Sequence, residues 1–445
     1  MTRRKLPGSR SPSVGHGQDQ DAAIAVDDAG PHHPPRLTLR SRLAVAVGHA
    51  VAAASRATGR GRGQVVGGRA MLRLSPGILA ELARDKRIVL VSATNGKSTT
   101  TRFVAEAMRV EGAVAHNRTG ANMAPGVAAA LAAARRAPAA TLEVDEAHLP
   151  GLLASTRARV VVLMNLSRDQ LDRGAEVKRL AVRWRIMLEQ ADWPLTVIGN
   201  ADDPLVAWAC SAARTVQWVG AGQWWREDSA LCPACSHTLD RDGKDWRCPG
   251  CGLRRPPPQW RTEGTVIVPP GGEPLPTHLR LPGRINVGNA AMAAAAVGVW
   301  GIPPATAIAA FEQVEDVDGR YVEAVADGRR VRLLLGKNPA SWTELIDIVA
   351  TSGHRLVIAI NSRGADGRDP SWLWDVPFER LTGREVWATG ERRFDLAVRL
   401  STAGLAVLGV TDDPLAAVAR TAGDEAVDVV ANYTAFQALR ARVAP

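Results

Sequence analysis

The feature that most constrains this 445-residue chain is an apolar run that leads directly into a short polar loop and a helix-forming segment. RIVLVSA (87–93) has the character of a buried strand, and a helix is expected from about Ser98. Between them lies the loop T-N-G-K (94–97). Because backbone N–H groups at a helix N-terminus bind phosphate, the segment predicts a nucleotide-binding strand–loop–helix unit.

The same alternation of apolar runs and helical segments continues along the chain. Further strands are predicted at 140–144, 159–166, 195–200, 265–268 and 277–281, and helices at 287–300 and 304–315. A second series of strands is predicted at 330–336, 355–361, 384–390 and 405–410. This rhythm is typical of α/β domains with mostly parallel sheets and flanking helices. We therefore expect a central α/β domain followed by a smaller one.

Composition shifts suggest the domain limits. Residues 1–36 are rich in Pro, Gly and Ser without periodicity, which predicts a disordered tail. RGRGQVVGGR (60–69) is expected to be a glycine-rich loop, and the turn around 318–330 marks a boundary. The resulting division is a central domain at 37–320, with an insert at about 225–256, and a C-terminal domain at 321–445.

The charge balance restricts the choice of partners. A net charge of +10 is compatible with nucleic acid or an anionic membrane surface. Basic runs interleaved with aromatic residues are missing, so we expect no nucleic acid partner. An apolar signal-peptide core and an 18-residue apolar run are also missing, so a cytoplasmic location is expected.

The loop residues suit phosphate chemistry. Lys97 offers a charge to terminal phosphates and Ser98 a hydroxyl to magnesium. Ala93 replaces the usual first glycine, and the loop is shorter than a Walker motif. The alternative is a chance Gly-Lys-Ser at a helix cap. Glu143 ends the next predicted strand and could hold magnesium directly or through water, or else lie in a solvated acidic turn.

The insert carries two C-x-x-C pairs separated by 12 residues: Cys232, Cys235, Cys248 and Cys251. This spacing predicts a closed, four-thiolate structural zinc site. Disulfides or free thiols are the alternatives, and a cytoplasmic location argues against disulfides. Cys210 lies on a predicted amphipathic helix and is expected to be a core thiol.

T-N-G-K-S-T (94–99) resembles the ATP loop of the Mur ligase superfamily, whose members activate a carboxylate as an acyl phosphate for attack by an amine. GRINVGNAAMAAA (283–295) resembles the superfamily motif G-x-H-N-x-x-N-A, with Ile285 in place of histidine. The resemblance implies that ATP is bound by the following residues: Thr94, Asn95, Gly96, Lys97, Ser98, Thr99, Asn286, Asn289 and Arg320. It also assigns magnesium to Ser98 and Glu143. Asn pairs also cap helices, which remains an alternative.

Other stretches depart from the ligases. Gln170 in NLSRDQLDR (165–173) replaces a ligase histidine, no counterpart of the ligases' N-terminal domain precedes the loop, and the cysteine insert is additional. With GANMAPG, KNPASW and ADGRDPSWLWD, these features resemble the MurT family from about residue 38 onward. Asn122, Lys337 and Asn338 are the implied substrate residues.

The MurT resemblance implies an amidotransferase supplied with ammonia by a partner, a GatD-type glutaminase. In the family, the second Asp of D-G-R-D completes the partner's Cys–His pair, and here that residue would be Asp369. Such a carboxylate orients and stabilises the imidazole. The alternative is that Asp366 and Asp369 only shape a glycine turn. Trp372, Trp374 and Phe378 would anchor the partner or pack the core.

The implied reaction is ATP-dependent amidation of the α-carboxylate of D-glutamate in the lipid II stem peptide, which gives D-isoglutamine. Its cofactors would be ATP, Mg²⁺ and structural Zn²⁺, and it would take place at the inner face of the plasma membrane. Two alternatives remain from the residues. One is a free-standing ligase that joins an amino acid to a peptide or folate, and the other is a P-loop ATPase whose zinc ribbon binds nucleic acid.

Overall fold

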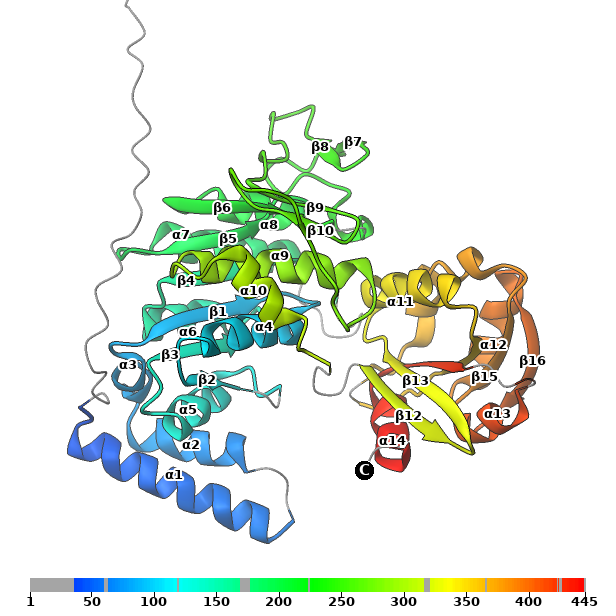
Figure 1. Ribbon diagram of the computed structural model, residues 1–445, viewed down its shortest axis with the longest axis horizontal. Coiled ribbons are helices and arrows are strands. Elements are labelled where there is room, and N and C mark those ends of the chain that lie inside the picture. The colour runs from blue at the N-terminus through cyan, green and yellow to red at the C-terminus, as the bar shows by residue number, and fades with distance from the viewer. Residues whose placement is uncertain are drawn as a thin grey trace, which may run out of the picture. The chain divides into compact units, whose positions relative to one another are not determined.

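In the part of the chain that the computed structural model describes, the strands form three sheets, of nine, six and two strands (Figure 1). The structure describes residues 36–59, 63–117, 120–168, 177–222, 225–315, 321–364, 366–421, 423 and 426–443. The predicted disordered tail therefore lies outside the described residues, apart from Arg36. The nine-stranded sheet uses residues 87–276 and the six-stranded sheet residues 321–431. The domain division at Arg320 stays a prediction.

The larger sheet has the strand order β11-β10-β9-β6-β5-β4-β1-β3-β2. Its strands are β1 (Arg87–Ser92), β2 (Val114–His116), β3 (Ala139–Glu143), β4 (Val160–Leu163), β5 (Thr196–Asn200), β6 (Thr215–Gly220), β9 (Trp260–Glu263), β10 (Val266–Val268) and β11 (Leu275–Pro276). The strands from β2 to β9 pair in parallel, and β10 and β11 pair antiparallel at the edge. The predicted parallel α/β architecture is confirmed.

Both faces of this sheet are covered by helices, which explains why its strands are almost continuously apolar. In β1, Ile88 and Leu90 face one core, and Val89 and Val91 face the other. The first core is covered by α3 (Ile78–Ala83), α5 (Ala124–Ala133), α6 (Leu149–Thr156), α7 (Val177–Glu189) and α8 (Pro204–Cys210). The second is covered by α4 (Lys97–Arg109), α9 (Arg284–Gly298) and α10 (Pro304–Phe311). Cys210 is buried in the first core, as predicted.

The smaller sheet has the order β12-β13-β17-β14-β15-β16 and is parallel except for β12. Its strands are β12 (Tyr321–Ala326), β13 (Arg329–Leu335), β14 (Arg355–Ala359), β15 (Glu385–Thr389), β16 (Ala406–Thr411) and β17 (Val427–Ala431). Around it lie α11 (Pro339–Ser352), α12 (Arg393–Thr402), α13 (Pro414–Arg420) and α14 (Tyr433–Val443), with the 3-10 helices η3 (Pro370–Asp375) and η4 (Phe378–Leu381). The predicted second α/β unit is thus present.

The glycine-rich loop predicted at 60–69 is wrong for its described part. A helical pair, α1 (Leu39–Ala57) and α2 (Gln64–Leu74), occupies this region. A Cβ on Gly67 would lie 2.5 Å from the Gly48 carbonyl oxygen, and one on Gly68 would lie 1.8 Å from that of Pro125. These glycines therefore permit close backbone approach inside a packed helix, instead of forming a loop.

The strand predictions also need correction. Residues 277–281 do not form a strand, because β11 ends at Pro276 and Thr277 bonds back to the Thr265 carbonyl through both its amide and its hydroxyl. The central strand β17 was missed because Asp428 interrupts its apolar pattern. β12 was also missed, since its residues were assigned to the boundary turn.

Asp428 is tolerated in a central strand because three side chains compensate its charge. Arg332 donates to it from Nε at 2.7 Å and from Nη2 at 2.8 Å, and the Ser352 hydroxyl donates at 2.7 Å. Burial alone would raise the pKa of Asp428, but these hydrogen bonds and one with His354 outweigh burial, so the pKa is lowered.

None of the described helices has the length and apolar character needed to cross a bilayer.

The close packing of α2 gives a stability prediction. Gly68→Ala should lower the free energy of unfolding by about 1–3 kcal/mol, because the added methyl group meets the Pro125 carbonyl. Gly151→Ala is the matched control, since this helical glycine has open space where a Cβ would lie. It should be neutral or stabilising by up to about 1 kcal/mol. Urea denaturation measures both, and equal effects would contradict the packing argument.

Candidate functional site

The predicted phosphate loop lies at the carboxyl end of β1 and leads into α4. Gly96 precedes the first helical residue with a φ of 85°, a left-handed conformation that glycine adopts without strain. A Cβ at this position would lie 2.6 Å from Asn289 Oδ1 and 2.9 Å from Met164 Cε. A glycine is therefore required here on both conformational and steric grounds.

An amide side chain from the neighbouring strand fixes the loop. Asn165, just beyond β4, accepts from the Asn95 backbone N–H through Oδ1 at 2.9 Å and donates from Nδ2 to the Asn95 carbonyl at 2.9 Å. The Thr94 hydroxyl bonds with the backbone of Ser167. Asn165 and Ser167, which the sequence analysis did not assign to the site, therefore fix the conformation of the loop.

Lys97 is almost fully buried, with 3% of its surface exposed. Its Nζ donates to the carbonyl oxygens of Ala93 and Thr94 and forms an ion pair with Glu146 at 3.3 Å. A buried ammonium of this kind requires compensation, which these oxygens provide. Glu146 was missed by sequence reasoning, because no motif distinguishes it from the other acidic residues after β3.

Ser98 and Glu143, the predicted magnesium ligands, are in hydrogen-bond contact. The Ser98 hydroxyl donates to Glu143 Oε2 at 2.7 Å, and Asn122 Nδ2 donates to Glu143 Oε1 at 3.3 Å. Asn117 pairs with both backbone groups of Glu143 at 2.8 Å. Glu143 is 5% exposed, so it does not lie in a solvated turn. A carboxylate beside a hydroxyl at a helix N-terminus fits the oxygen donors that Mg²⁺ prefers.

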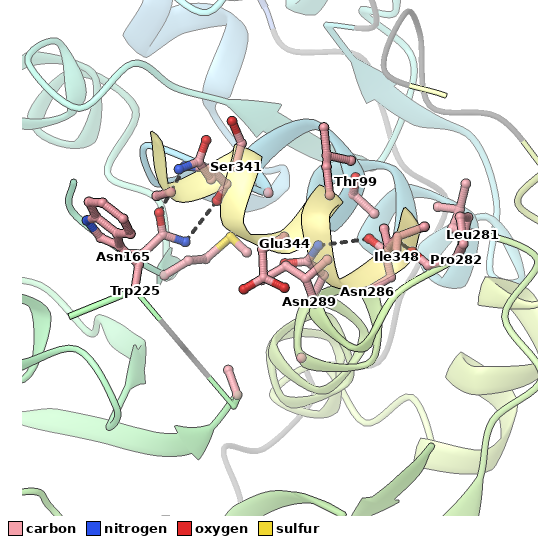
Figure 2. Close-up of a pocket in the computed structure, with 18 of the residues that line it drawn as sticks. Thr99, Asn165, Trp225, Leu281, Pro282, Asn286, Asn289, Ser341, Glu344 and Ile348 are labelled. Carbon is pink, nitrogen blue, oxygen red and sulfur yellow. Dashed lines mark hydrogen bonds between the residues drawn. The ribbon is translucent and has the colours of Figure 1, made fainter. Parts of the chain in front are cut away.

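The two asparagines of α9 lie beside this loop. Asn289 Nδ2 donates to Asn286 Oδ1 at 3.1 Å, and Asn286 Nδ2 donates to the Pro282 carbonyl at 2.7 Å (Figure 2). The N-cap residue of α9 is Gly283, which makes no side-chain capping bond. The asparagine pair therefore does not cap the helix through accepted backbone bonds, and it lines a cavity.

The elements that border this cavity include the loop and the start of α4 with Asn95, Gly96 and Thr99, the start of α9, and α11 (Figure 2). Leu281, Pro282, Ile285 and Ile348 give it apolar walls. Such a combination of apolar walls with a few convergent polar groups is typical of a small-ligand site. Its position directly beside the phosphate loop suits the nucleoside part of a nucleotide.

Glu344 of α11 also lines the cavity, and sequence reasoning missed it. Within the described part of the chain, its carboxyl group makes no hydrogen bond or ion pair. Burial, and then repulsion from Asp347, raises the pKa of Glu344 to about 7, and Arg284 and Arg380 offset this only in part. An uncompensated carboxyl in a pocket wall is the kind of group that marks ligand sites.

The D-G-R-D segment separates its two aspartates by environment. Asp366 is 9% exposed and accepts from the Thr434 backbone at 2.8 Å and from the Arg363 backbone at 3.1 Å. Asp369 is exposed and, as the N-cap of η3, accepts from the Ser371 backbone N–H at 2.9 Å. This bond, followed by one with the Ser371 side chain, lowers the pKa of Asp369. Asp366 is thus structural, while Asp369 keeps an ionised carboxylate at the surface.

The three aromatic residues after Asp369 divide in the same way. Trp372 and Phe378 are buried, each with its ring centroid 5.9 Å from that of Trp342, so they pack the core. Trp374 is 58% exposed, and the Arg399 guanidinium lies over its ring at 5.2 Å. Of the three residues, only Trp374 is available to a partner.

The structure gives less information on the predicted substrate residues at the start of α11. Asn338 is buried and caps α11 through a reciprocal pair with Ser341, and it also accepts from Asn95 Nδ2 at 3.2 Å. The Lys337 backbone N–H donates to Ser341 Oγ. These bonds show structural roles and do not test substrate binding. Arg320 and Gln170 lie outside the described residues.

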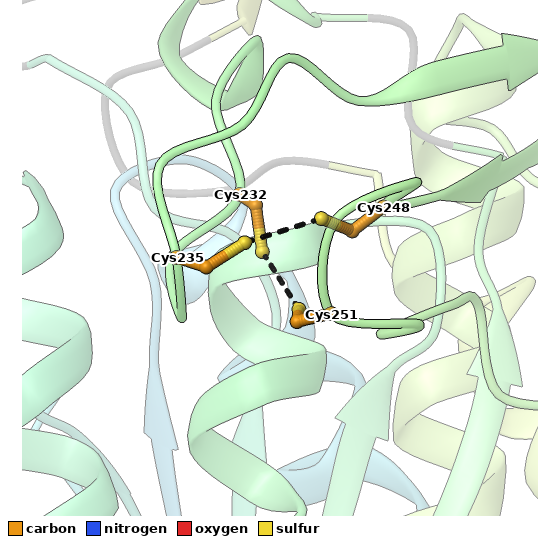
Figure 3. A group of neighbouring side chains, drawn as sticks. All are labelled: Cys232, Cys235, Cys248 and Cys251. Carbon is orange, nitrogen blue, oxygen red and sulfur yellow. Dashed lines mark hydrogen bonds between the residues drawn. The ribbon is translucent and has the colours of Figure 1, made fainter.

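The four predicted cysteines converge in the insert, shown in Figure 3. Cys232 and Cys251 have their Sγ atoms 3.6 Å apart, Cys235 and Cys248 have theirs 3.3 Å apart, and all four lie within 4.8 Å of one another. Four thiolates bound to zinc at about 2.3 Å would lie roughly 3.7 Å apart, so the cluster fits the metal.

The insert is attached to the central domain through its own small core. Between the two cysteine pairs lies the hairpin of β7 (Asp240–Asp242) and β8 (Asp245–Arg247). Trp246 packs with Cys232, Cys248 and Ala207 of α8, and its indole N–H donates to the Ala201 carbonyl at 3.1 Å. A metal in the cluster would therefore stabilise this hairpin against the sheet.

Comparison with known families and proteins agrees with this geometry. The Mur ligase middle domain matches residues 91–226, and the MurT ligase C-terminal domain matches residues 335–436. The lipid II isoglutaminyl synthase (glutamine-hydrolyzing) subunit MurT of Staphylococcus aureus strain COL is 28% identical over 424 residues, 89% of this chain and 96% of the relative. The subunit of the same name from Streptococcus pneumoniae R6 is 28% identical over 79% of this chain and 85% of the relative.

The chain combines a Mur ligase middle domain with a MurT ligase C-terminal domain, and it is a ligase similar to the MurT subunits. A pseudomurein peptide ligase type C from Methanothermus fervidus superimposes with a TM-score of 0.63 at 17% identity, covering 80% of this chain and 78% of the other. MurF from Thermotoga maritima, solved in complex with ADP, gives 0.57 at 15% identity, with 81% of each chain covered. At these identities the structures establish the shared fold.

The cysteine cluster of this ligase gives a metal prediction. Freshly purified protein should carry about one zinc per chain, measured by elemental analysis. Cys232→Ser with Cys235→Ser should lose the metal and lower the melting temperature, because metal binding is coupled to local folding. Cys210→Ala is the control and should retain the zinc. Protein that was never exposed to chelators and yet contains no zinc would contradict this assignment.

Glu344 gives a pH-dependent prediction. Its pKa is about 4.5 in the unfolded chain and about 7 in the fold. The folded state therefore holds the extra proton, so the stability that Glu344 contributes falls as pH rises from about 4.5 to about 7. Glu344→Gln should be more stable than the parent at pH 8, by up to about 3 kcal/mol.

The advantage of Glu344→Gln should become small near pH 4.5 and disappear below it, because the parent carboxyl is then protonated in the fold and increasingly protonated in the unfolded chain. Denaturation across this pH range measures the difference. Glu273→Gln, at an exposed loop position, should show no such pH dependence. A constant difference between parent and Glu344→Gln at all pH values would refute the uncompensated burial of this carboxyl.

Proposed function

We propose that the chain is the synthase subunit of a two-protein amidotransferase. It would use ATP to activate the α-carboxylate of D-glutamate in the lipid II stem peptide, and ammonia would convert the acyl phosphate to D-isoglutamine. The proposal is carried mainly by one observation: a Mur-type phosphate loop and an exposed, ionised Asp369 occur together in a chain that carries both the Mur ligase middle and MurT C-terminal domains.

The nucleotide is assigned to the loop and the adjoining cavity. Backbone N–H groups at the start of α4 and the Lys97 ammonium would hold the phosphates. Lys97 already lies among carbonyl oxygens and Glu146, so only a local movement of its flexible side chain is needed. Asn286 and Asn289 would face the nucleoside, and Arg320 would add charge at the terminal phosphate.

Ser98 and Glu143 are the proposed magnesium ligands, and they are already in hydrogen-bond contact. When bound, the metal would neutralise charge on the transferring phosphoryl group. Asn122 and Asn117 hold the carboxylate and the backbone of Glu143 in place. Positive charge from Lys97 and Arg320 favours transfer to the substrate carboxylate, since catalysis of this step depends on positioning and electrostatics.

Ammonia would come from a GatD-type glutaminase that docks at the C-terminal domain. Asp369 supports this role because it is exposed and its carboxylate is held ionised by the Ser371 N–H. A carboxylate in this state can orient and stabilise the imidazolium of a partner's Cys–His pair. Trp374 offers an exposed aromatic anchor nearby in the sequence.

The lipid-linked substrate places the reaction at the inner face of the plasma membrane, with the chain as a peripheral protein. The thiolate cluster would hold a structural zinc, since four cysteines leave no open position for catalysis. In this scheme the metal orders the insert and takes no part in the amidation.

Two substitutions separate the two half-reactions. Asp369→Asn keeps the side-chain volume but removes the charge, so glutamine should no longer support amidation while ammonium salts restore part of the activity. Lys97→Ala should abolish amidation with either nitrogen donor, because it removes the phosphate contact. The assay measures amidated lipid II with purified complex, glutamine or ammonium, and ATP.

Assembly of each variant with the glutaminase, followed by gel filtration, is the control for folding. Normal glutamine-dependent turnover by Asp369→Asn would refute the shared triad. Near-normal amidation by Lys97→Ala would refute the nucleotide assignment. An Asp369→Asn complex that assembles and binds ATP, but is not rescued by ammonium, would place this carboxylate in the ligase reaction instead.

A further inference from the structure

The positive charge of the chain is concentrated in one short segment. Between Arg36 and Leu74 the sequence contains eight arginines and no aspartate or glutamate. The segment thus contributes +8 to a chain whose net charge is +10, so the rest of the sequence is nearly balanced. Such an asymmetry indicates an anionic partner for this segment and not for the chain as a whole.

The helix α1 in this segment presents an apolar face to solvent. Its buried residues are Ser41, Ala44, Gly48 and Ala52, which face α2 and the core beneath it. The opposite face carries exposed residues at three- and four-residue spacing: Leu39, Leu43, Ala46, Ala50, Ala53 and Ala57. Leu39 is 82% exposed and Leu43 is 63% exposed. Apolar residues on the outer face of a helix mark a surface that is completed by a partner.

The second helix also exposes apolar residues. In α2, Val66 is 47% exposed and Leu74 is 39% exposed. Figure 1 shows α2 between α1 and α5, so that α1 lies at the periphery. The close approach of α1 to α2 at Gly48 and Gly67 holds the two helices as one rigid pair.

Basic residues border the apolar stripe. Arg42, His49 and Arg56 recur at seven-residue spacing along one side of α1, and all three are exposed. Arg40 lies on the other side and donates from Nε to the Leu74 carbonyl at 2.5 Å, which also ties α1 to the end of α2. An exposed apolar stripe with a basic row beside it is the pattern of helices that lie in the interface of an anionic bilayer.

Charge and apolar character together decide between the possible partners. Nucleic acid would use the arginines but leave the leucines in water, since its outer surface is phosphate and sugar. A second protein would need acidic complementarity around an apolar stripe. An anionic lipid surface satisfies both features at once, because headgroups pair with arginine while leucine enters the acyl boundary.

We propose that the outer face of the α1–α2 pair is a membrane-docking surface that binds the anionic phospholipids of the inner leaflet. The choice of partner rests on the proposed function, in which the substrate is lipid-linked. Docking through α1 and α2 would hold the enzyme on the surface where that substrate is found, without a membrane-spanning segment and at a position separate from the residues of the phosphate loop and from Asp369.

The test is co-sedimentation of the full-length protein with vesicles. Wild-type protein should bind vesicles of phosphatidylcholine with phosphatidylglycerol and not vesicles of phosphatidylcholine alone, and high salt should weaken the binding. Two double variants remove the proposed contacts: Leu39→Ser with Leu43→Ser, and Arg42→Glu with Arg56→Glu. All four side chains are exposed, so the fold should be retained. Each variant should lower the partition coefficient at least tenfold.

A matched control separates a defined surface from net charge. Arg261→Glu with Arg330→Glu changes the net charge by the same amount at exposed strand positions and should bind vesicles as the wild type does. Amidation of detergent-dispersed lipid II should be unchanged in all three double variants. This assay tests the proposed function separately from membrane docking. If wild-type protein failed to amidate lipid II, the proposed function would be refuted, but the vesicle-binding result would still hold.

Four results would overturn the proposal: wild-type binding that ignores phosphatidylglycerol, variants that bind as the wild type does, a control that loses binding equally, or loss confined to the arginine variant. The last result would indicate electrostatic attraction without insertion. Retention of wild-type protein on nucleic acid instead of vesicles, abolished by Arg42→Glu with Arg56→Glu, would assign the surface to that partner.

Discussion

The site depends on the position of β1 between β3 and β4 in a parallel sheet. The register pairs Val91 with Glu143 and Ser92 with Leu163, so all three strands end at one edge. At this edge, Ser98 at the start of α4 bonds with the Glu143 carboxylate at the end of β3, and Asn95 of the phosphate loop bonds with the Asn165 amide just beyond β4. A one-residue slip of β1 would move each of its side chains to the opposite face of the sheet and so disrupt both cores. The packing of the cores therefore also fixes the strand register that positions the site.

Buried charges in this protein are compensated by partners that are distant in the sequence. Lys97 is paired with Glu146, 49 residues away, and Asp428 with Arg332, 96 residues away. Glu344 differs from these, because within the described residues its carboxyl has no hydrogen-bond or ion-pair partner and its pKa is raised. Since an uncompensated carboxyl costs folding free energy, its position in a cavity wall is consistent with a ligand that completes the site.

The C-terminal domain uses a buried arginine to shape the segment that follows Asp369. Arg399 is 3% exposed and donates to the carbonyl oxygens of Leu373 and Val376 and to Glu379. These bonds fix η3 and η4 on α12, and with them the short helix that Asp369 caps. The position of the exposed Asp369 carboxylate therefore depends on the buried hydrogen bonds of Arg399. Such a network holds a surface residue in place without a large buried area around it.

The sequence by itself determined the parts of this protein that local pattern encodes. Apolar runs predicted most strands, the Gly-Lys-Ser loop predicted its place at the end of β1, and cysteine spacing predicted the cluster. Tertiary structure alone decided α2, whose glycines read as a loop, and β17, whose aspartate is neutralised by an arginine 96 residues away. It also decided the roles of Asn165, Glu146 and Glu344, because a polar residue becomes functional through neighbours that the sheet, and not the sequence, brings together.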